Sequence, residues 1–336
     1  MSRWAHDPER AADALIERGL GEIALGHNVL LVNQGGALPT MLAARGMAHA
    51  VWNRRLIGGF AATPWPPAGP FESALVRLPK ARDEQAMTLH AALSVLAAGG
   101  RVILYGGNDE GIRSAGGVLE ELAGTIETLA IRGHGRVLAG RRPEQASVRG
   151  TLAAWRRVGS IEIAGIARDW VDYPGIFAAG RLDEGTALLL AALPPLAARA
   201  RVLDYGCGSG VIGTAVRAVE PSVALDMLDS DAVALEAVRE NAPGAKLVLG
   251  TRVGDAGRQV YDAILSNPPL HQGIAEDHSL LQRLVADAPA YLARGGVLHM
   301  VVQRRIPLER MLTTHFADTK IAAENGRYRV WTARRG

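Results

Sequence analysis

The chain has 336 residues, of which 48% are hydrophobic and 21% are charged, so it is long enough for two globular domains, each with its own core. Its net charge of +3, carried by arginine more than by lysine, is compatible with an RNA partner but does not require one. The single cysteine, Cys207, excludes an internal disulfide and a cysteine-rich zinc site, and it suits a reducing compartment.

The N-terminal segment, residues 1–20, is rich in charged side chains and contains no apolar run, so we expect neither a signal peptide nor a membrane anchor there. No other stretch approaches the roughly 20 uninterrupted apolar residues that a membrane-spanning helix needs. These observations predict a cytoplasmic protein without a membrane partner.

The rest of the N-terminal half alternates short apolar runs with amphipathic stretches, which is typical of a parallel α/β sheet. Strands are expected at residues 28–33, 48–52, 74–78 and 101–105, and helices at 41–45 and 83–96. A Pro-rich surface loop, TPWPPAGP (63–70), interrupts the pattern, and a hairpin is expected around 132–137. Residues 141–170 join the two halves, and the pattern there does not separate linker from strand.

The C-terminal half resumes the same alternation from Arg201. Five strands are expected at residues 201–205, 223–228, 246–249, 262–266 and 297–302, with helices at 211–219, 231–241, 278–292 and 308–316. Two further β-like runs, 320–323 and 328–332, flank Asn325-Gly326, a strong hairpin signal because both residues tolerate positive φ. Five parallel strands followed by an antiparallel hairpin is the order of a class I methyltransferase sheet, whereas a nicotinamide-binding Rossmann domain would continue with a parallel strand.

The two halves share landmarks at nearly constant spacing. Gly99-Gly100 and Gly295-Gly296 each precede a strand, and each half ends in a hairpin that contains glycine. The repetition indicates duplication, although any two α/β domains share a Gly-Gly pair before a strand. The first half lacks the acid and glycine pattern of the second. We therefore expect a degenerate domain at residues 1–160, which binds RNA or gives structural support, and a catalytic domain at 161–336.

A glycine loop follows the first strand of the catalytic half. The strand delivers Asp204 and then Gly206, Gly208 and Gly210 at alternate positions, directly before a helix. Glycines let the backbone turn tightly and approach a ligand without a Cβ clash. Asp204 can reach backbone amides or the amino-acid end of a cofactor. The four residues are expected to bind a nucleotide-like cofactor, with a plain tight turn as the alternative.

A second acid, Asp229, ends the next strand, with Ser230 beside it. In dinucleotide-type folds an acid at this position hydrogen-bonds both ribose hydroxyls, and its charge disfavours a ribose phosphate such as that of NADP. Asp226 and Asp231 compete for the role. Asp226 lies within the strand by alternation, and Asp231 opens the helix, where its charge suits the N-terminus. Asp229, with Ser230, is the expected ribose site.

The sequence Ser-Asn-Pro-Pro follows the fourth strand. The Asn267 side-chain oxygen and the Pro268 carbonyl can each accept one hydrogen of an NH2 group, which aims the nitrogen lone pair at a methyl donor. The prolines fix φ and hold this geometry. An ordinary Pro-Pro loop is the alternative. The motif comes after the glycine loop and Asp229, and this order favours an N-methyltransferase that uses S-adenosylmethionine. Asn267 is expected to contact the cofactor as well.

At these residues the chain resembles the ribosomal RNA guanine-N2 methyltransferases of the RsmC/RlmG type. SNPPLHQG (266–273) resembles the SNPPFHDG of that family, and LDEGT (182–186) resembles its Asp-x-Gly-Ser segment. Leu78-Pro79-Lys80 resembles a Trp-Pro-Lys sequence of its first domain. The resemblance implies two tandem Rossmann-like class I methyltransferase domains, the N-terminal one degenerate, and N2-methylation of a guanine in ribosomal RNA or a ribosomal subunit.

One departure concerns the substrate. The family has phenylalanine where this chain has Leu270, and an aromatic ring there stacks on the flipped base. The expected substrate-binding residues are therefore Pro269, Leu270, His271 and Phe177, with the stacking role open to His271 or Phe177. Three alternatives stay open: methylation of adenine, methylation of a protein glutamine amide, and a non-catalytic RNA chaperone that binds the cofactor.

Two further features are less specific. The histidines are scattered without the spacing of metal ligands, so no metal is expected. The pairs Arg54-Arg55 and Arg304-Arg305 face either RNA phosphates or solvent. A monomer is compatible with the sequence, which does not fix the oligomeric state.

Overall fold

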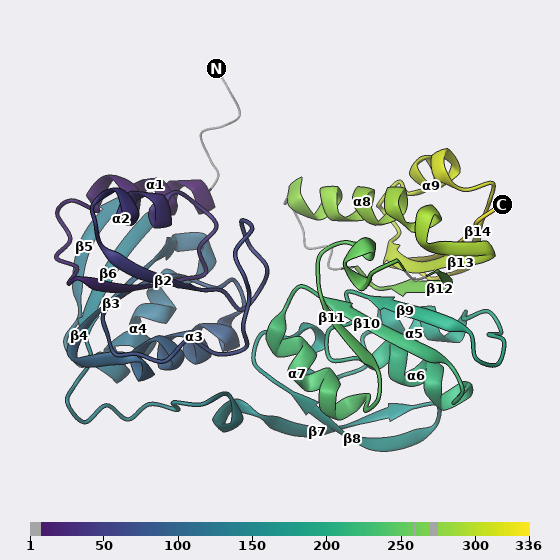
Figure 1. The fold of residues 1–336 in the computed structure, drawn as a ribbon, viewed down its shortest axis with the longest axis horizontal. Coiled ribbons are helices and arrows are strands. Elements are labelled where there is room, and N and C mark those ends of the chain that lie inside the picture. Colours follow the sequence, from purple (N-terminus) through teal and green to yellow (C-terminus); the bar gives the residue numbers. More distant parts are fainter. Residues whose placement is uncertain (1–7, 259, 269–274) are drawn as a thin grey trace. The chain divides into compact units, whose positions relative to one another are not determined.

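The computed structural model describes residues 8–258, 260–268 and 275–336, and it divides the chain into two units, Met1–Arg156 and Arg157–Gly336 (Figure 1). The boundary lies slightly before the predicted one at residues 160 and 161. The reason is that Arg157 begins strand β7 (Arg157–Ile163), which pairs along its whole length with β8 (Ile166–Asp172) of the second unit.

The first unit is a six-stranded sheet in the order β2-β1-β3-β4-β6-β5. The first four strands are parallel, and β6 and β5 add an antiparallel hairpin. The strands are β1 (Asn28–Val32), β2 (Ala48–Trp52), β3 (Phe71–Arg77), β4 (Leu96–Gly107), β5 (Glu127–Arg132) and β6 (Gly135–Arg141). The helices are α1 (Pro8–Gly19), α2 (Leu38–Ala44), α3 (Arg82–Ser94) and α4 (Ile112–Ala123), of which α1 and α4 were not predicted. Helices α1 and α2 cover one face of the sheet, and α3 and α4 cover the other (Figure 1).

The second unit is a seven-stranded sheet in the order β11-β10-β9-β12-β13-β15-β14, in which β15 runs antiparallel to the other six strands. The strands are β9 (Arg201–Tyr205), β10 (Ala224–Asp229), β11 (Lys246–Leu249), β12 (Tyr261–Ser266), β13 (Leu292–Gln303), β14 (Asp318–Glu324) and β15 (Tyr328–Arg334). The helices are α5 (Glu184–Ala191), α6 (Val211–Val219), α7 (Ala232–Asn241), α8 (Ala275–Tyr291) and α9 (Glu309–His315). The predicted parallel strands and closing hairpin are confirmed, and α5 is an addition.

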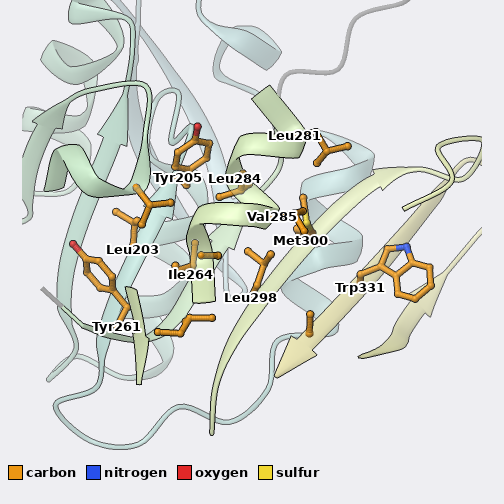
Figure 2. Close-up of a cluster of buried hydrophobic side chains, with 14 of the residues drawn as sticks. Leu203, Tyr205, Tyr261, Ile264, Leu281, Leu284, Val285, Leu298, Met300 and Trp331 are labelled. Carbon is orange, nitrogen blue, oxygen red and sulfur yellow. The ribbon is translucent and has the colours of Figure 1, made fainter. Parts of the chain in front are cut away.

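Buried side chains fill both faces of this second sheet. On one face, α8 and α9 cover the cluster drawn in Figure 2, which includes Leu203, Ile264, Leu298 and Trp331. On the other face, α5, α6 and α7 enclose a second cluster around Val202. The strands are apolar on both faces because a parallel sheet is covered on both sides.

The two sheets share one topology and one irregularity. The order β2-β1-β3-β4-β6-β5 matches β10-β9-β12-β13-β15-β14, so among the described strands β11 is the one without a counterpart in the first sheet. The matching strands β4 and β13 each have 12 residues and contain a glycine at positive φ, which is Gly99 at 73° in β4 and Gly295 at 74° in β13. At that point the pairing with the neighbouring strand shifts register, between Phe71 and Ser73 or between Tyr261 and Ala263. The predicted pair of related α/β units is confirmed.

None of the described helices is long and apolar enough to cross a membrane.

Asn241, at the end of α7, fastens the β7–β8 hairpin to the rest of the second unit. Its Oδ1 accepts the Val171 N–H at 2.8 Å, and its Nδ2 donates to the carbonyls of Val171 at 2.8 Å and Ser209 at 3.0 Å. The Trp170 indole adds a bond to the Ser209 hydroxyl at 3.1 Å. Asn241 thus joins the hairpin, helix α7 and the loop that begins α6.

Replacing Asn241 by alanine is expected to lower the free energy of unfolding by about 1–3 kcal/mol, because it removes three bonds and leaves the Val171 amide and carbonyl without these partners. Urea unfolding measures the loss, and faster hydrogen exchange at the Val171 amide locates it. Asn241→Asp keeps the acceptor for the Val171 N–H and should lie between the wild type and Asn241→Ala. Wild-type stability in Asn241→Ala would contradict this account.

Candidate active site

The candidate site lies where β9, β10 and β12 end. These strands are parallel neighbours, so their carboxyl ends leave the sheet at one edge, and the chain crosses to opposite sides of β9 for β10 and β12. Open α/β sheets bind ligands at such a switch point. The structure therefore places the glycine loop, Asp229 and Asn267 at the same edge of the sheet.

The glycine loop is held down by the neighbouring strand. The amides of Gly206 and Cys207 both donate to the Leu228 carbonyl at the end of β10, at 2.8 and 3.0 Å. Cys207 is buried, and burial raises the pKa of its thiol well above the usual value. A thiol that stays protonated is a poor nucleophile, which agrees with a packing role for Cys207.

Two glycines of the loop have different surroundings. Gly210 has a φ of 94°, and a Cβ there would lie 3.1 Å from Met227 Cε and 3.3 Å from a methyl of Val238, so the loop packs tightly at the start of α6. Gly208 has a φ of 53°, and a Cβ there would meet no atom of the described residues within 4 Å. The described residues therefore leave room beside the Cα of Gly208, as the approach of a ligand requires.

Asp229 is the acid that meets this loop. Its Oδ2 accepts the Gly208 N–H at 2.8 Å, and its Oδ1 accepts the Asp231 N–H at 2.9 Å. Asp231 caps α7, as expected, and accepts the Val233 N–H at 2.9 Å. Asp226 instead accepts a hydrogen bond from Tyr261 Oη at 2.7 Å. Of the three competing acids, Asp229 alone lies at the loop, with the half-buried Ser230 beside it.

Asp204 lies beneath the loop and has no exposed surface. Its Oδ2 accepts the Gly213 N–H in the first turn of α6 at 2.9 Å, and no partner of its Oδ1 is found among the described residues. Burial raises the pKa of Asp204 to about 7, against the opposing effect of the Gly213 N–H and with a smaller contribution from Asp229. The sequence left two partners open for Asp204, a backbone amide or the amino-acid end of a cofactor. The structure shows the contact with a backbone amide.

The side chain of Asn267 has a fixed orientation. Its Nδ2 donates to Asp183 Oδ2 at 3.0 Å and to Thr186 Oγ1 at 2.9 Å. A carboxylate only accepts, so the NH2 group must be the end that faces Asp183, and the amide oxygen points away from this pair. Ser266 Oγ donates to the Tyr205 carbonyl at 2.8 Å and joins the end of β12 to β9. Pro268 is buried directly after Asn267.

Sequence reasoning did not assign a function to Asp183 and Thr186. Asp183 is the N-cap of α5 and accepts the Thr186 N–H at 3.0 Å, so the carboxylate that caps this helix also holds the Asn267 amide. An Asp followed by an apolar helical run is a helix-start signal that could have been found, but its pairing with Asn267 joins residues 84 positions apart.

The expected substrate residues are only partly described. Pro269, Leu270 and His271 lie outside the described residues. Phe177 begins a short 3-10 helix, and its side chain is 52% exposed. Among the described residues, no group of three or more His, Cys, Asp or Glu side chains could hold a metal ion.

Two known domain families match this chain. The methyltransferase small domain family matches residues 168–332, and its N-terminal domain family matches residues 58–151. Ribosomal RNA small subunit methyltransferase C of Ectopseudomonas mendocina is 34% identical over 80% of this chain and 81% of its own length. The protein of the same name from Shewanella sediminis is 30% identical over 78% and 76%.

The solved structure of the T. thermophilus 16S rRNA N2 G1207 methyltransferase, in complex with AdoMet and guanosine, covers 99% of this chain and 93% of its own. The TM-score is 0.84 at 24% sequence identity, so the two chains share the whole two-unit fold. With both domain families matched in order and these relatives covered over most of their length, the resemblance found in the sequence is confirmed: the chain belongs to the ribosomal RNA small subunit methyltransferase C family of class I, S-adenosylmethionine-dependent methyltransferases.

Proposed function

We propose that this chain transfers the methyl group of S-adenosylmethionine to the exocyclic N2 amine of a guanine in ribosomal RNA. The observation that carries the proposal is the orientation of Asn267, whose NH2 group is bound by Asp183 and Thr186 and whose oxygen therefore stays available as an acceptor. The names of the relatives support ribosomal RNA as the substrate, and the guanosine in the related structure supports the base. Such a substrate also supports a cytoplasmic location.

The amine of guanine is a poor nucleophile because its lone pair is delocalised into the ring. The Asn267 oxygen and the Pro268 carbonyl each accept one N–H of this amine, which turns the lone pair toward the methyl donor. These acceptors also stabilise the positive charge that develops on the nitrogen. The methylated nitrogen is acidic and loses its proton readily, so no strong general base is required. Pro269, Leu270, His271 and Phe177 remain the proposed contacts to the base.

The loop residues fit the cofactor. The room beside the Cα of Gly208 and the carboxylate of Asp229 form the proposed cradle, with Gly206, Gly210 and Ser230 completing it. When bound, S-adenosylmethionine supplies a methyl group activated by a sulfonium leaving group. Asp229 accepts hydrogen bonds from the ribose hydroxyls. Asp204 acts through the loop, because its carboxylate holds the start of α6 from beneath.

The first unit has different chemistry at the matching edge. Asn53 follows β2, and its Oδ1 accepts the Gln34 N–H at 2.7 Å, a contact similar to that of Asp229 with the Gly208 N–H in the second unit. Gln34 is buried and donates to Tyr105 Oη. The space over this edge is thus filled by the protein's own side chains. We propose that the first unit binds no cofactor and acts in RNA binding or in support of the second unit.

Transfer of tritiated methyl groups tests the proposed reaction. The protein is offered deproteinised small-subunit ribosomal RNA and assembled small subunits, and the labelled product is digested to nucleosides. N2-methylguanosine is the expected product. Label in N6-methyladenosine or in protein would replace this function with one of the two alternative amines, and cofactor binding without any transfer would favour a chaperone.

Asn267→Ala is expected to lower kcat by about 10²-fold or more, because it removes an acceptor that acts on the reacting nitrogen. The KM for RNA and the Kd for S-adenosylmethionine should change little by comparison. Single-turnover transfer at varied RNA concentration measures the rate and its dependence on RNA, and calorimetric titration measures the Kd for S-adenosylmethionine. Full activity in this variant would exclude the mechanism.

Asp183→Ala is expected to lower kcat by about 10-fold, because the Asn267 amide then loses the carboxylate that fixes its direction. The same change removes a helix cap, at a cost of about 1 kcal/mol in stability. Asp183→Ser separates these effects: serine can cap α5 but is too short to reach Asn267. This variant should recover stability and not kcat.

Glu184→Ala is the matched control for Asp183, because Glu184 is the neighbouring carboxylate and binds Arg327 and Asn325 instead. It should keep the wild-type kcat. An Asp183→Ser variant with normal kcat would show that the cap, not the hold on Asn267, is what matters.

The buried carboxyl of Asp204 predicts a pH dependence of stability. Its pKa is about 7 in the folded protein against an ordinary value of 3.8, so the folded state holds this proton more tightly than the unfolded chain. The contribution of Asp204 to the free energy of unfolding therefore falls as pH rises from about 4 to about 7, by an amount on the order of a few kcal/mol. Asp204→Asn cannot ionise and should lose less stability across this range. Urea unfolding of both proteins at pH 5 and at pH 8 measures the difference, and equal losses would refute the assignment.

A further inference from the structure

A pocket of about 400 Å³ lies in the second unit where β13 ends. Its lining includes four arginines and one acid, together with the indole of Trp331. The residues that matter here are Arg304, Arg305, Glu309, Arg310, Arg329 and Trp331. A hollow lined in this way is suited to an anion.

The arginines are only partly neutralised. Glu324 binds Arg329 at 2.9 Å and lies 3.9 Å from Arg304. Arg305 donates to the neutral Gln303 Oε1 at 2.9 Å, and no ion pair of Arg305 or Arg310 is found among the described residues. Both of these side chains are exposed. Arginine presents a planar fork of donors that matches the oxygens of a phosphate.

Trp331 adds an independent indication. Its side chain is 4% exposed, and its Nε1 is buried without a hydrogen-bond partner in the described part of the chain. A buried donor without a partner costs about 1–3 kcal/mol, so an acceptor supplied by a ligand would stabilise this arrangement. Figure 2 shows the indole at the margin of the buried cluster, directed away from the other labelled side chains. The Arg329 guanidinium lies 5.8 Å from the centre of the ring.

The pocket lies at the same edge of the sheet as Asn267. Strands β12 and β13 are parallel, with Ser266 paired to Met300, so Asn267 and Arg304 both follow the carboxyl ends of neighbouring strands. Strand spacing and rise per residue put their backbones on the order of 10 Å apart. A polynucleotide with one base at Asn267 can therefore reach this pocket with the phosphates of adjacent nucleotides.

We propose that this pocket binds backbone phosphates of the RNA strand next to the methylated nucleotide. Arg305 and Arg310 supply the charge, and the Trp331 N–H donates to a phosphate oxygen. This proposal rests on the proposed function for its ligand, because an RNA substrate brings the phosphates. The pocket holds the strand and does not touch the reacting amine.

The test is the double variant Arg305→Gln and Arg310→Gln in the full-length protein. The affinity for a short fluorescein-labelled single-stranded RNA is measured between about 50 and 200 mM salt. Removing two phosphate contacts should make the plot of log affinity against log salt shallower by about 1.4. The KM for ribosomal RNA should rise while kcat and the Kd for S-adenosylmethionine stay as in the wild type.

Arg294→Gln is the matched control, an exposed arginine near the other end of β13 at the opposite edge of the sheet. It should keep the wild-type slope. Trp331→Phe keeps a ring in the cluster and removes the N–H, so it should weaken RNA binding, and urea unfolding shows whether the cluster remains intact.

An unchanged slope and KM in the double variant would overturn the proposal. So would a loss of cofactor binding, or a defect seen with assembled subunits but not with naked RNA, which would point to a ribosomal protein. The proposed function fails differently: the wild type would then transfer no methyl group to guanine, while the salt dependence of RNA binding could still be compared between the variants.

Discussion

A parallel sheet must release the carboxyl ends of its strands at one edge, and the candidate site depends on this constraint. The loop after β9, Asp229 at the end of β10 and Asn267 after β12 are far apart in the chain, but the strands that carry them are neighbours in the sheet. Backbone amides of the loop donate to β10, and the Ser266 hydroxyl joins β12 to β9. The order of the strands therefore brings these residues together, and hydrogen bonds between the ends of neighbouring strands stabilise the arrangement.

A second carboxylate, outside this set of strands, completes the site. Asp183 begins α5 and receives hydrogen bonds both from the helix and from Asn267. One side chain thus couples the start of a helix to the direction of an amide group. In the proposed mechanism, the direction of the Asn267 amide is set by a residue that does not contact the substrate.

Much of the second unit follows from local pattern. Strands β9 and β11 and helix α6 have the predicted bounds because apolar runs, glycines and caps all agree there. Helix α4 escaped prediction because Gly116 and Gly117 lie inside it and disfavour a helix. Helix α5 escaped because its sequence, EGTALLLA, has no polar face to reveal a period.

The β7–β8 hairpin and the contact between Asp183 and Asn267 were not predicted either, for different reasons. The hairpin turns at Ala164 and Gly165, both at positive φ, and alanine gives no turn signal of the kind that Asn-Gly gives. Most of β7 is exposed, so it lacks the alternation of a half-buried strand. The Asp183–Asn267 bond depends on how α5 packs on the sheet, which a single sequence does not encode locally. By contrast, the relation between the two units was predicted from the Gly-Gly pairs together with the closing hairpins, and both sheets show the same register shift near Gly99 and Gly295.

The orientation of Asn267 also bears on how many methyl groups one nitrogen receives. Because Asp183 and Thr186 hold the NH2 end, Asn267 turns an acceptor toward the substrate in the proposed mechanism. An unmodified amine brings two hydrogens for the two proposed acceptors, whereas a monomethylated amine brings one and leaves an acceptor unmatched. Under the proposed mechanism we therefore expect the product to be held less firmly than the substrate, so that the geometry that promotes the first transfer disfavours a second one.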